Sequence, residues 1–314
     1  MDSPAADSPQ IRATALARCA VIGGNGAVGG LLAGVLAEAG SALTIADLAA
    51  APASTPPPHA TRVALDVRAP SAALRDALAG ADCAVLALPE TAALDALPHV
   101  LAALPAGALL VDTLSVKTPF VDAALAADAP VELLSLNPMF APALGFAGHA
   151  VLAVEPAPGP RSAALLALLS ERARAVVTVA DAAAHDRLSA ALQVATHASV
   201  LGFALALRQL DVELDVLLAV APPPFLALLA LLARIDAGRP ETYADIQRAN
   251  PFGADARAAL AGGLAQLDAA ARASDPRQAE TLIADAGALL GEHREALATQ
   301  AAQLLAGLTP PATV

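Results

Sequence analysis

Short apolar runs that alternate with helical segments constrain the fold of this chain more than any other feature. The runs occupy residues 19–23, 42–46, 62–67, 83–88, 108–113, 131–136, 150–154 and 175–179. A short strand, a helix and another strand form a βαβ unit, so this spacing predicts a largely parallel sheet with helices on its faces. The proline-rich segment 51–61 predicts a loop between the second and third runs instead of a crossover helix.

The strand pattern stops near residue 180, and the rest of the chain predicts long helices rich in alanine and leucine. Prolines at 222–224, 240, 251 and 276 separate these helices. We therefore expect an α/β domain over residues 17–180, an all-helical domain over 181–308 and a disordered leader at 1–16.

Composition excludes several classes of protein. The chain is 57% hydrophobic and 15% charged, which allows an ample core and excludes a disordered chain. Its 30 acidic and 18 basic residues give a net charge of −12, which argues against a nucleic-acid partner because phosphate binding needs dense Lys and Arg. Cys19 and Cys83 are too few for a disulfide framework or a structural zinc site, which predicts a reducing cytoplasm and no metal.

An uncharged stretch at 188–207 is long enough to cross a membrane. However, it contains Ser189, Gln193, Thr196, His197 and Ser199, and such polar groups are costly in lipid. The N-terminus MDSPAADSPQ also lacks the basic region of a signal peptide. We interpret the stretch as a buried helix of a soluble protein.

A glycine loop follows the first apolar run directly. It satisfies G-x-G-x-x-G with Gly24, Gly26 and Gly29, and it opens a helix expected over residues 27–39. Such a loop turns tightly, lets the backbone approach a pyrophosphate and offers the N–H groups of a helix N-terminus, so it predicts a Rossmann-type dinucleotide-binding domain. Asp47 ends the second run, where an acid accepts the ribose 2′-hydroxyl and repels a 2′-phosphate, so NAD is expected over NADP. The predicted cofactor contacts are Gly24, Asn25, Gly26, Ala27, Val28, Gly29, Asp47, Leu88 and Pro89.

The only lysine of the chain, Lys117, lies just after the fifth run in VDTLSVKTPF. Ligands of open α/β sheets bind beyond the carboxyl ends of the strands, so Thr113, Ser115 and Lys117 are expected to face the cofactor crevice. The alternative is a helix that begins near Pro119 and is capped by Ser115 or Thr118.

These motifs, in their order, resemble the prephenate dehydrogenase family over about residues 19–307. The resemblance is carried by the glycine loop, DTLSVK at 112–117, NPMFAP at 137–142, HDRLSAALQVATH at 185–197, Arg234 and YADI at 243–246. It implies a Rossmann domain followed by an all-α dimerisation domain, a homodimer, and NAD-dependent oxidation and decarboxylation of a prephenate-type ring. We also expect the helical domain to be buried largely by assembly.

The resemblance also implies roles for single residues. Ser115 matches a serine at the substrate's C4 substituent, and Lys117 matches a lysine beside cofactor and substrate. Gln193 and His197 match substrate contacts, and Arg234 matches an arginine that binds a substrate carboxylate. His185 begins the same helix and is either a site residue or, with Asp186 and Arg187, part of an ion cluster at the helix start.

Two departures from the family pattern bear on the substrate. Asn137 stands where the family has the histidine of His-Pro-Met-Phe, the base that takes the proton of the 4-hydroxyl, and Leu226 stands where an arginine is common. A smaller difference is Phe140-Ala141-Pro142 in place of Phe-Gly-Pro. An amide has no useful basicity, and loss of a general base costs about 100- to 10,000-fold in rate.

A substrate with an amino group at C4 does not need that base, because the nitrogen lone pair can expel the hydride. Asn137 is then a catalytic-site residue that orients the amine, and the expected enzyme is a 4-amino-4-deoxyprephenate dehydrogenase that makes 4-aminophenylpyruvate for specialised metabolism. The alternatives are a prephenate dehydrogenase of tyrosine biosynthesis, an arogenate dehydrogenase, and a pseudoenzyme that binds NAD without chemistry.

Overall fold

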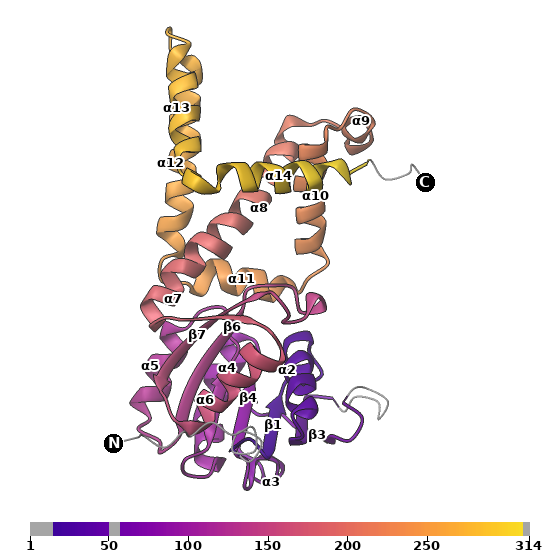
Figure 1. Cartoon of the computed structure of the whole chain (residues 1–314), viewed down its shortest axis with the longest axis vertical. Helices are drawn as coiled ribbons and strands as arrows, with labels where there is room; N and C mark the ends of the chain where they lie inside the picture. The colour runs from indigo at the N-terminus through magenta and orange to yellow at the C-terminus, as the bar shows by residue number, and fades with distance from the viewer. Residues whose placement is uncertain (1–14, 50–56, 310–314) are drawn as a thin grey trace, which may run out of the picture. The chain divides into compact units, whose positions relative to one another are not determined.

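An eight-stranded sheet forms the centre of the N-terminal part of the chain. The computed structural model describes residues 15–49 and 57–309 (Figure 1). The strands are β1 (Arg18–Ile22), β2 (Ala42–Asp47), β3 (Thr61–Ala64), β4 (Cys83–Leu86), β5 (Leu109–Asp112), β6 (Glu132–Pro138), β7 (Ala150–Ala157) and β8 (Val176–Val179). Their order in the sheet is β3-β2-β1-β4-β5-β6-β7-β8, and only the β6–β7 pair is antiparallel. The prediction of a largely parallel α/β sheet is confirmed.

Helices cover both faces of this sheet. They are α2 (Ala27–Glu38), α3 (Ala72–Leu78), α4 (Glu90–Ala103), α5 (Thr118–Ala126) and α6 (Pro160–Ala167). Side chains of α2 and α6 share one buried apolar cluster, which includes Leu36 and Leu165, with Val21 of β1. Side chains of α3, α4 and α5 share a second cluster with Ile22, the next residue of β1. Alternate residues of the strand therefore face opposite layers, as the pleat of a buried strand requires.

The strand order reverses between β1 and β4, and this position defines the candidate site. After β1 the chain continues to β2 on one side, whereas after β4 it continues to β5 on the other side. The loops that follow β1 and β4 therefore run in opposite directions along the sheet. In open α/β sheets, ligands bind at this point, beyond the carboxyl ends of the strands. The glycine loop follows β1, and Leu88 and Pro89 follow β4.

Helices alone form the rest of the described chain. After the short turn that follows β8, the elements are α7 (Ala182–Ser189), a π-helical turn (Ala190–Ala195), α8 (Thr196–Leu210), α9 (Leu214–Ala219), α10 (Pro223–Asp236), α11 (Pro240–Ala249), α12 (Gly253–Arg272), α13 (Arg277–Ala288) and α14 (Arg294–Ala306). The chain divides into two compact units at Leu188 and Ser189, a few residues after the boundary expected near 180. The predicted leader lies outside the described residues except for residues 15 and 16, and so does most of the predicted loop at 51–61.

The helical stretch Ala182–Leu210 is less buried than the sequence suggested. It spans 29 residues and is long and apolar enough, by length and composition only, to cross a membrane, yet 22% of its apolar window is buried within the chain. One face, with Ala190 and Val194, packs against Ile246 of α11. Leu192 and Leu205 are 57% and 56% exposed. In the single chain the neighbouring helices cover only one side of this stretch, and its burial by assembly stays a prediction.

Candidate active site

The glycine loop has the geometry that a dinucleotide needs. Helix α2 begins after Gly26, and no side chain caps its N-terminus, so its first N–H groups are free to bind an anion. A Cβ on Gly29 would collide with the carbonyl of Gly23, and one on Gly24 would lie 2.7 Å from Cγ2 of Ile45. Gly23 itself has a positive φ of 79°, which favours glycine. The backbone is therefore as close-packed as the loop's sequence predicts.

Asp47 lies beside this loop at the end of β2. Its Oδ2 accepts a hydrogen bond of 3.1 Å from the backbone N–H of Asn25, and its Oδ1 accepts one of 2.8 Å from Leu48. The Asn25 side chain donates to the carbonyl of Ala49, and Arg62 of β3 donates to Asn25 Oδ1 at 3.3 Å. These contacts hold the carboxylate at the edge of the glycine loop.

Lys117 is wholly buried and forms an ion pair. Its Nζ donates to Asp112 Oδ1 at 2.7 Å and to the carbonyl of Leu136 at 2.9 Å, and the two charged side chains are 0% and 1% exposed. Ser135 also donates to Asp112. Burial lowers the pKa of Lys117, and the attraction of Asp112 opposes that shift. The ammonium thus joins the ends of β5 and β6 and does not face an open crevice as the sequence suggested.

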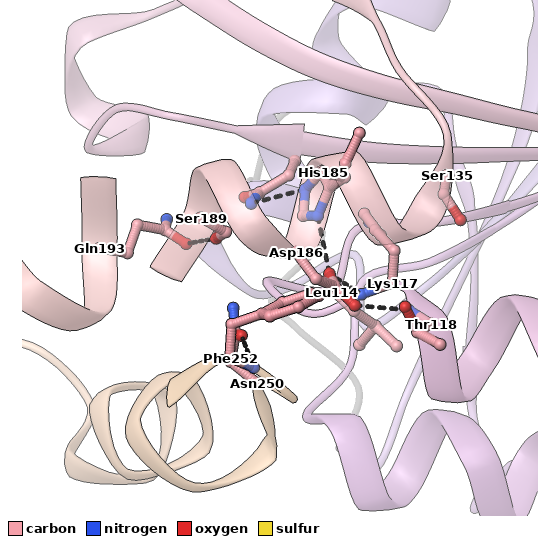
Figure 2. Close-up of polar contacts among 12 residues, drawn as sticks. Leu114, Lys117, Thr118, Ser135, His185, Asp186, Ser189, Gln193, Asn250 and Phe252 are labelled. Carbon is pink, nitrogen blue, oxygen red and sulfur yellow. Dashed lines mark hydrogen bonds and ion pairs between the residues drawn. The ribbon is translucent and has the colours of Figure 1, made fainter. Parts of the chain in front are cut away.

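Helix α5 begins at Thr118, and its N-terminus is capped from a distant part of the chain. The N–H groups of Lys117 and Thr118 donate to Asp186 Oδ1 and Oδ2 at 2.7 and 2.9 Å (Figure 2). A carboxylate at this position also interacts favourably with the helix dipole. The sequence offered Ser115 or Thr118 as the cap, and the structure adds Asp186 of α7, which accepts from the first N–H groups of the helix. Ser115 lies half-buried in the turn between β5 and α5.

Asn137 and His185 meet in the interior of the same unit. Asn137 Nδ2 lies 3.2 Å from His185 Nε2, and His185 Nδ1 lies 2.9 Å from Asp186 Oδ1. Burial lowers the pKa of His185. Burial alone would raise the pKa of Asp186, but hydrogen bonds from His185, Thr118 and Lys117 outweigh it and the pKa lies below its ordinary value. The pair is therefore a neutral imidazole beside a carboxylate at the cap of α5, and a site role for His185 stays a prediction.

The predicted substrate contacts Gln193, His197 and Arg234 belong to the helical unit. Ser189 donates to Gln193 Oε1 at 2.5 Å, which leaves the Gln193 amino group as a donor. His197 is 8% exposed, its ring centroid lies 5.0 Å from that of Tyr243, and its Nδ1 has no partner among the described residues. Burial and the charge of Arg234 lower the pKa of His197. Arg234 is exposed, so it needs no buried counter-ion and is available to an anion.

Sequence reasoning overlooked two residues of this site, Asp112 and Ser135. The signal was present, because a buried lysine requires an anion and Asp112 lies in the same motif. No group of three or more His, Cys, Asp or Glu side chains that could hold a metal occurs in residues 15–49 and 57–309.

Comparisons with known proteins place this sequence among dehydrogenases. The chain is 43% identical over 291 residues to the 4-amino-4-deoxyprephenate dehydrogenase of Streptomyces pristinaespiralis, which covers 93% of this chain and 97% of the relative. It is 33% identical over 144 residues to the T-protein of Enterobacter agglomerans, which covers 46% and 38%. No protein-family model matches the chain.

Solved structures show the same fold. Prephenate dehydrogenase from Aquifex aeolicus, in complex with hydroxyphenyl propionate and NAD⁺, has a TM-score of 0.65 at 16% identity and covers 91% of this chain and 98% of its own. Synechocystis arogenate dehydrogenase has a TM-score of 0.58 at 17% identity and covers 90% and 96%. The long, nearly full-length match to the Streptomyces relative, on a fold shared with these enzymes, shows that the chain belongs to the prephenate dehydrogenase family.

Proposed function

We propose that this protein is an NAD-dependent dehydrogenase that converts 4-amino-4-deoxyprephenate to 4-aminophenylpyruvate with release of CO2. The observation that carries the proposal is Asn137, a buried amide at the position where the family's motif has a basic histidine. The named activity of the 43% identical relative supports the same substrate.

The chemistry of the substrate explains why an amide suffices at this position. A 4-hydroxyl must lose its proton as hydride leaves C4, so prephenate needs a base. A neutral 4-amino group instead expels hydride with its own lone pair and becomes an iminium, and departure of the C1 carboxylate as CO2 then completes the aromatic ring. Asn137 accepts no proton in this sequence of steps. It orients the amino group through hydrogen bonds.

The residues of the glycine loop fit NAD. The uncapped N-terminus of α2 binds the pyrophosphate, and the missing side chains at Gly24 and Gly29 keep the backbone in the close turn that this requires. Asp47 accepts the ribose 2′-hydroxyl and disfavours a 2′-phosphate, while Leu88 and Pro89 line the loop after β4. When bound there, NAD supplies the hydride acceptor.

The remaining polar residues bind the substrate. The family resemblance assigns Ser115 to the C4 substituent, and it assigns Gln193 and His197 to substrate contacts. Arg234 binds a carboxylate with its guanidinium group, a geometry that allows two parallel hydrogen bonds. Lys117 acts from the interior, where its ion pair with Asp112 fixes the strand ends that carry Ser115 and Asn137.

Steady-state kinetics with the purified protein and NAD test this proposal. We expect kcat/KM for 4-amino-4-deoxyprephenate to exceed that for prephenate by about 100-fold or more, the usual value of a positioned base. Equal or better turnover of prephenate would contradict the proposed substrate. Absence of turnover with either compound or arogenate, together with calorimetric binding of NAD, would identify a binding protein without activity.

The variant Asn137→His is the matched test of the amide. It restores the family's base, so activity on prephenate should rise. Activity on the amine should fall, because the variant loses the amide that orients the amino group. Asn137→Ala is the control, since it removes the amide without adding a base and should lower activity on the amine without improving prephenate.

We further propose that the protein is a cytoplasmic homodimer of specialised, antibiotic-type metabolism that assembles through its helical unit. Large apolar side chains on these helices are exposed in the single chain, among them Leu192, Leu205, Val216, Val220, Leu264, Ile283 and Leu304. Exposed apolar surface of this extent favours a protein partner. The free thiols of Cys19 and Cys83 support a reducing compartment. Light scattering at micromolar concentration should give twice the mass of the chain, and a monomeric mass would refute the dimer.

A further inference from the structure

The hydrogen bonds around His185 determine which atom of Asn137 is free to meet a substrate. Asp186 is ionised and accepts from two backbone N–H groups, so it can only accept from His185 as well. Nδ1 of His185 therefore carries the ring proton. Because the imidazole is neutral, its Nε2 has no proton and acts as an acceptor.

This tautomer fixes the orientation of the Asn137 amide. An acceptor at His185 Nε2 requires a donor 3.2 Å away, and the amino group Nδ2 is the only donor that an asparagine side chain has. The opposite orientation would place the amide oxygen against the lone pair of the imidazole. The amide then turns its carbonyl oxygen Oδ1 away from His185 Nε2, and an amide oxygen can accept a hydrogen bond from a ligand.

We propose that His185 and Asp186 are positioning residues that hold the Asn137 amide with its carbonyl oxygen toward the C4 amino group of the substrate. This inference rests on the proposed function, since it explains how that site selects an amine. A carbonyl oxygen accepts an N–H of the amine and leaves the nitrogen lone pair free to expel hydride. A reversed amide would donate to that lone pair and withdraw it from the ring.

Buried hydrogen bonds hold His185 and Asp186 in place. Asp186 caps the N-terminus of α5, and His185 is the preceding residue of α7. Both side chains are 0% exposed, and Asn137 is 2% exposed on β6. Water therefore does not compete for these hydrogen bonds, and a wrong amide orientation leaves a buried group unsatisfied.

Nitrogen NMR of the histidine-labelled wild-type protein tests the tautomer without any substrate. We expect the His185 signals at neutral pH to show a protonated Nδ1 and an unprotonated Nε2. A protonated Nε2 would overturn the inference, because the amide would then have to present its oxygen to His185. This result does not depend on which substrate the enzyme uses.

A double-mutant cycle tests the coupling to catalysis. His185→Leu removes the acceptor and should lower kcat by about 10- to 100-fold with little change in KM, as expected for a misplaced group at the reacting atoms. In the Asn137→Ala background the same substitution should cost nothing further, because His185 acts through Asn137. Equal losses in both backgrounds would overturn the positioning role and indicate a structural one.

A conservative variant separates positioning from folding. In His185→Gln the terminal amide lies near the position of Nε2 and can still accept from Asn137, so kcat should recover to within about threefold of wild type. A Gln variant as slow as His185→Leu, with an unchanged dissociation constant for NAD, would contradict the inference. If wild type prefers prephenate, the proposed substrate fails, and the cycle on that substrate still decides whether His185 acts through Asn137.

Discussion

Replacement of Lys117 by methionine should destabilise the protein far more than replacement of a surface cation. The substitution keeps the length of the side chain and removes its charge. Asp112 then keeps only the N–H of Leu114, at 3.1 Å, and the hydroxyl of Ser135, while the carbonyl of Leu136 loses its donor. Removal of one partner from a buried ion pair costs about 3–5 kcal/mol, a large share of the 5–15 kcal/mol that holds a typical domain together.

A surface pair provides the matched control. Arg272 and Asp268 are 2.8 Å apart, close to the 2.7 Å of the buried pair, but their side chains are 78% and 61% exposed. Arg272→Met should therefore cost only about 0.3–0.5 kcal/mol, as for other exposed helix pairs. The comparison keeps the kind of interaction and changes its burial.

Urea unfolding followed by circular dichroism, at one protein concentration, measures both free energies. The double variant Lys117→Met with Asp112→Leu should recover most of the loss, because an apolar pair leaves no buried charge. A loss below about 1 kcal/mol for Lys117→Met alone would refute the reasoning, since an uncompensated buried carboxylate costs more than that. The lysine would then serve the ligand instead of the fold.

Three further predictions concern the cofactor and pH. Asp47→Ser should raise kcat/KM with NADP relative to NAD by about tenfold or more, because a carboxylate no longer repels the 2′-phosphate, and an unchanged ratio of the two would show that Asp47 does not face the ribose. Gly29→Ala should weaken NAD binding in calorimetry, because the added Cβ collides with the loop. Gly34 lies on the same helix, and a Cβ there would meet nothing within 4 Å. Gly34→Ala should therefore leave the affinity for NAD unchanged, which would exclude a general effect of alanine on the helix. Burial lowers the pKa values of His185 and His197, so the unfolded state takes up protons first as the pH falls through 6.5. The free energy of unfolding measured in urea should therefore be constant above that pH. Below it, this free energy should drop by up to about 1.4 kcal/mol per pH unit for each group. A His185→Gln variant with an equally steep drop would show that His185 is not one of the groups responsible.

Local sequence patterns predicted most of the fold and the cofactor loop, because both depend on nearby residues. Alternating apolar runs located every strand, and the glycine spacing located the turn into α2. The cap of α5 was not predictable in this way, since Asp186 lies 68 residues from Thr118 in the chain. A carboxylate in the middle of a helix gives no local sign that it caps another helix.

Burial was the property that single residues predicted least well. Lys117 was expected to face a crevice and is wholly enclosed, whereas Arg234 lies between apolar residues in the sequence and is exposed. In each case the outcome depends on which elements pack around the residue, and a lysine or arginine fits either surrounding. Asn137 in place of the motif histidine was informative from the sequence alone. The basicity of a side chain depends on its residue type, whereas burial depends on the elements that pack around it.

The unequal distribution of apolar burial also affects how this protein folds. The α/β unit contains two extensive buried clusters, while the buried cluster of the helical unit, among the described residues, consists of Ala190, Val194 and Ile246. In the proposed dimer, most of the helical unit's stability comes from the second chain and depends on its concentration. We expect newly made chains to fold the nucleotide-binding unit first and to expose apolar surface on the helical unit until a second chain binds. Dilution of the protein would then destabilise the helical unit.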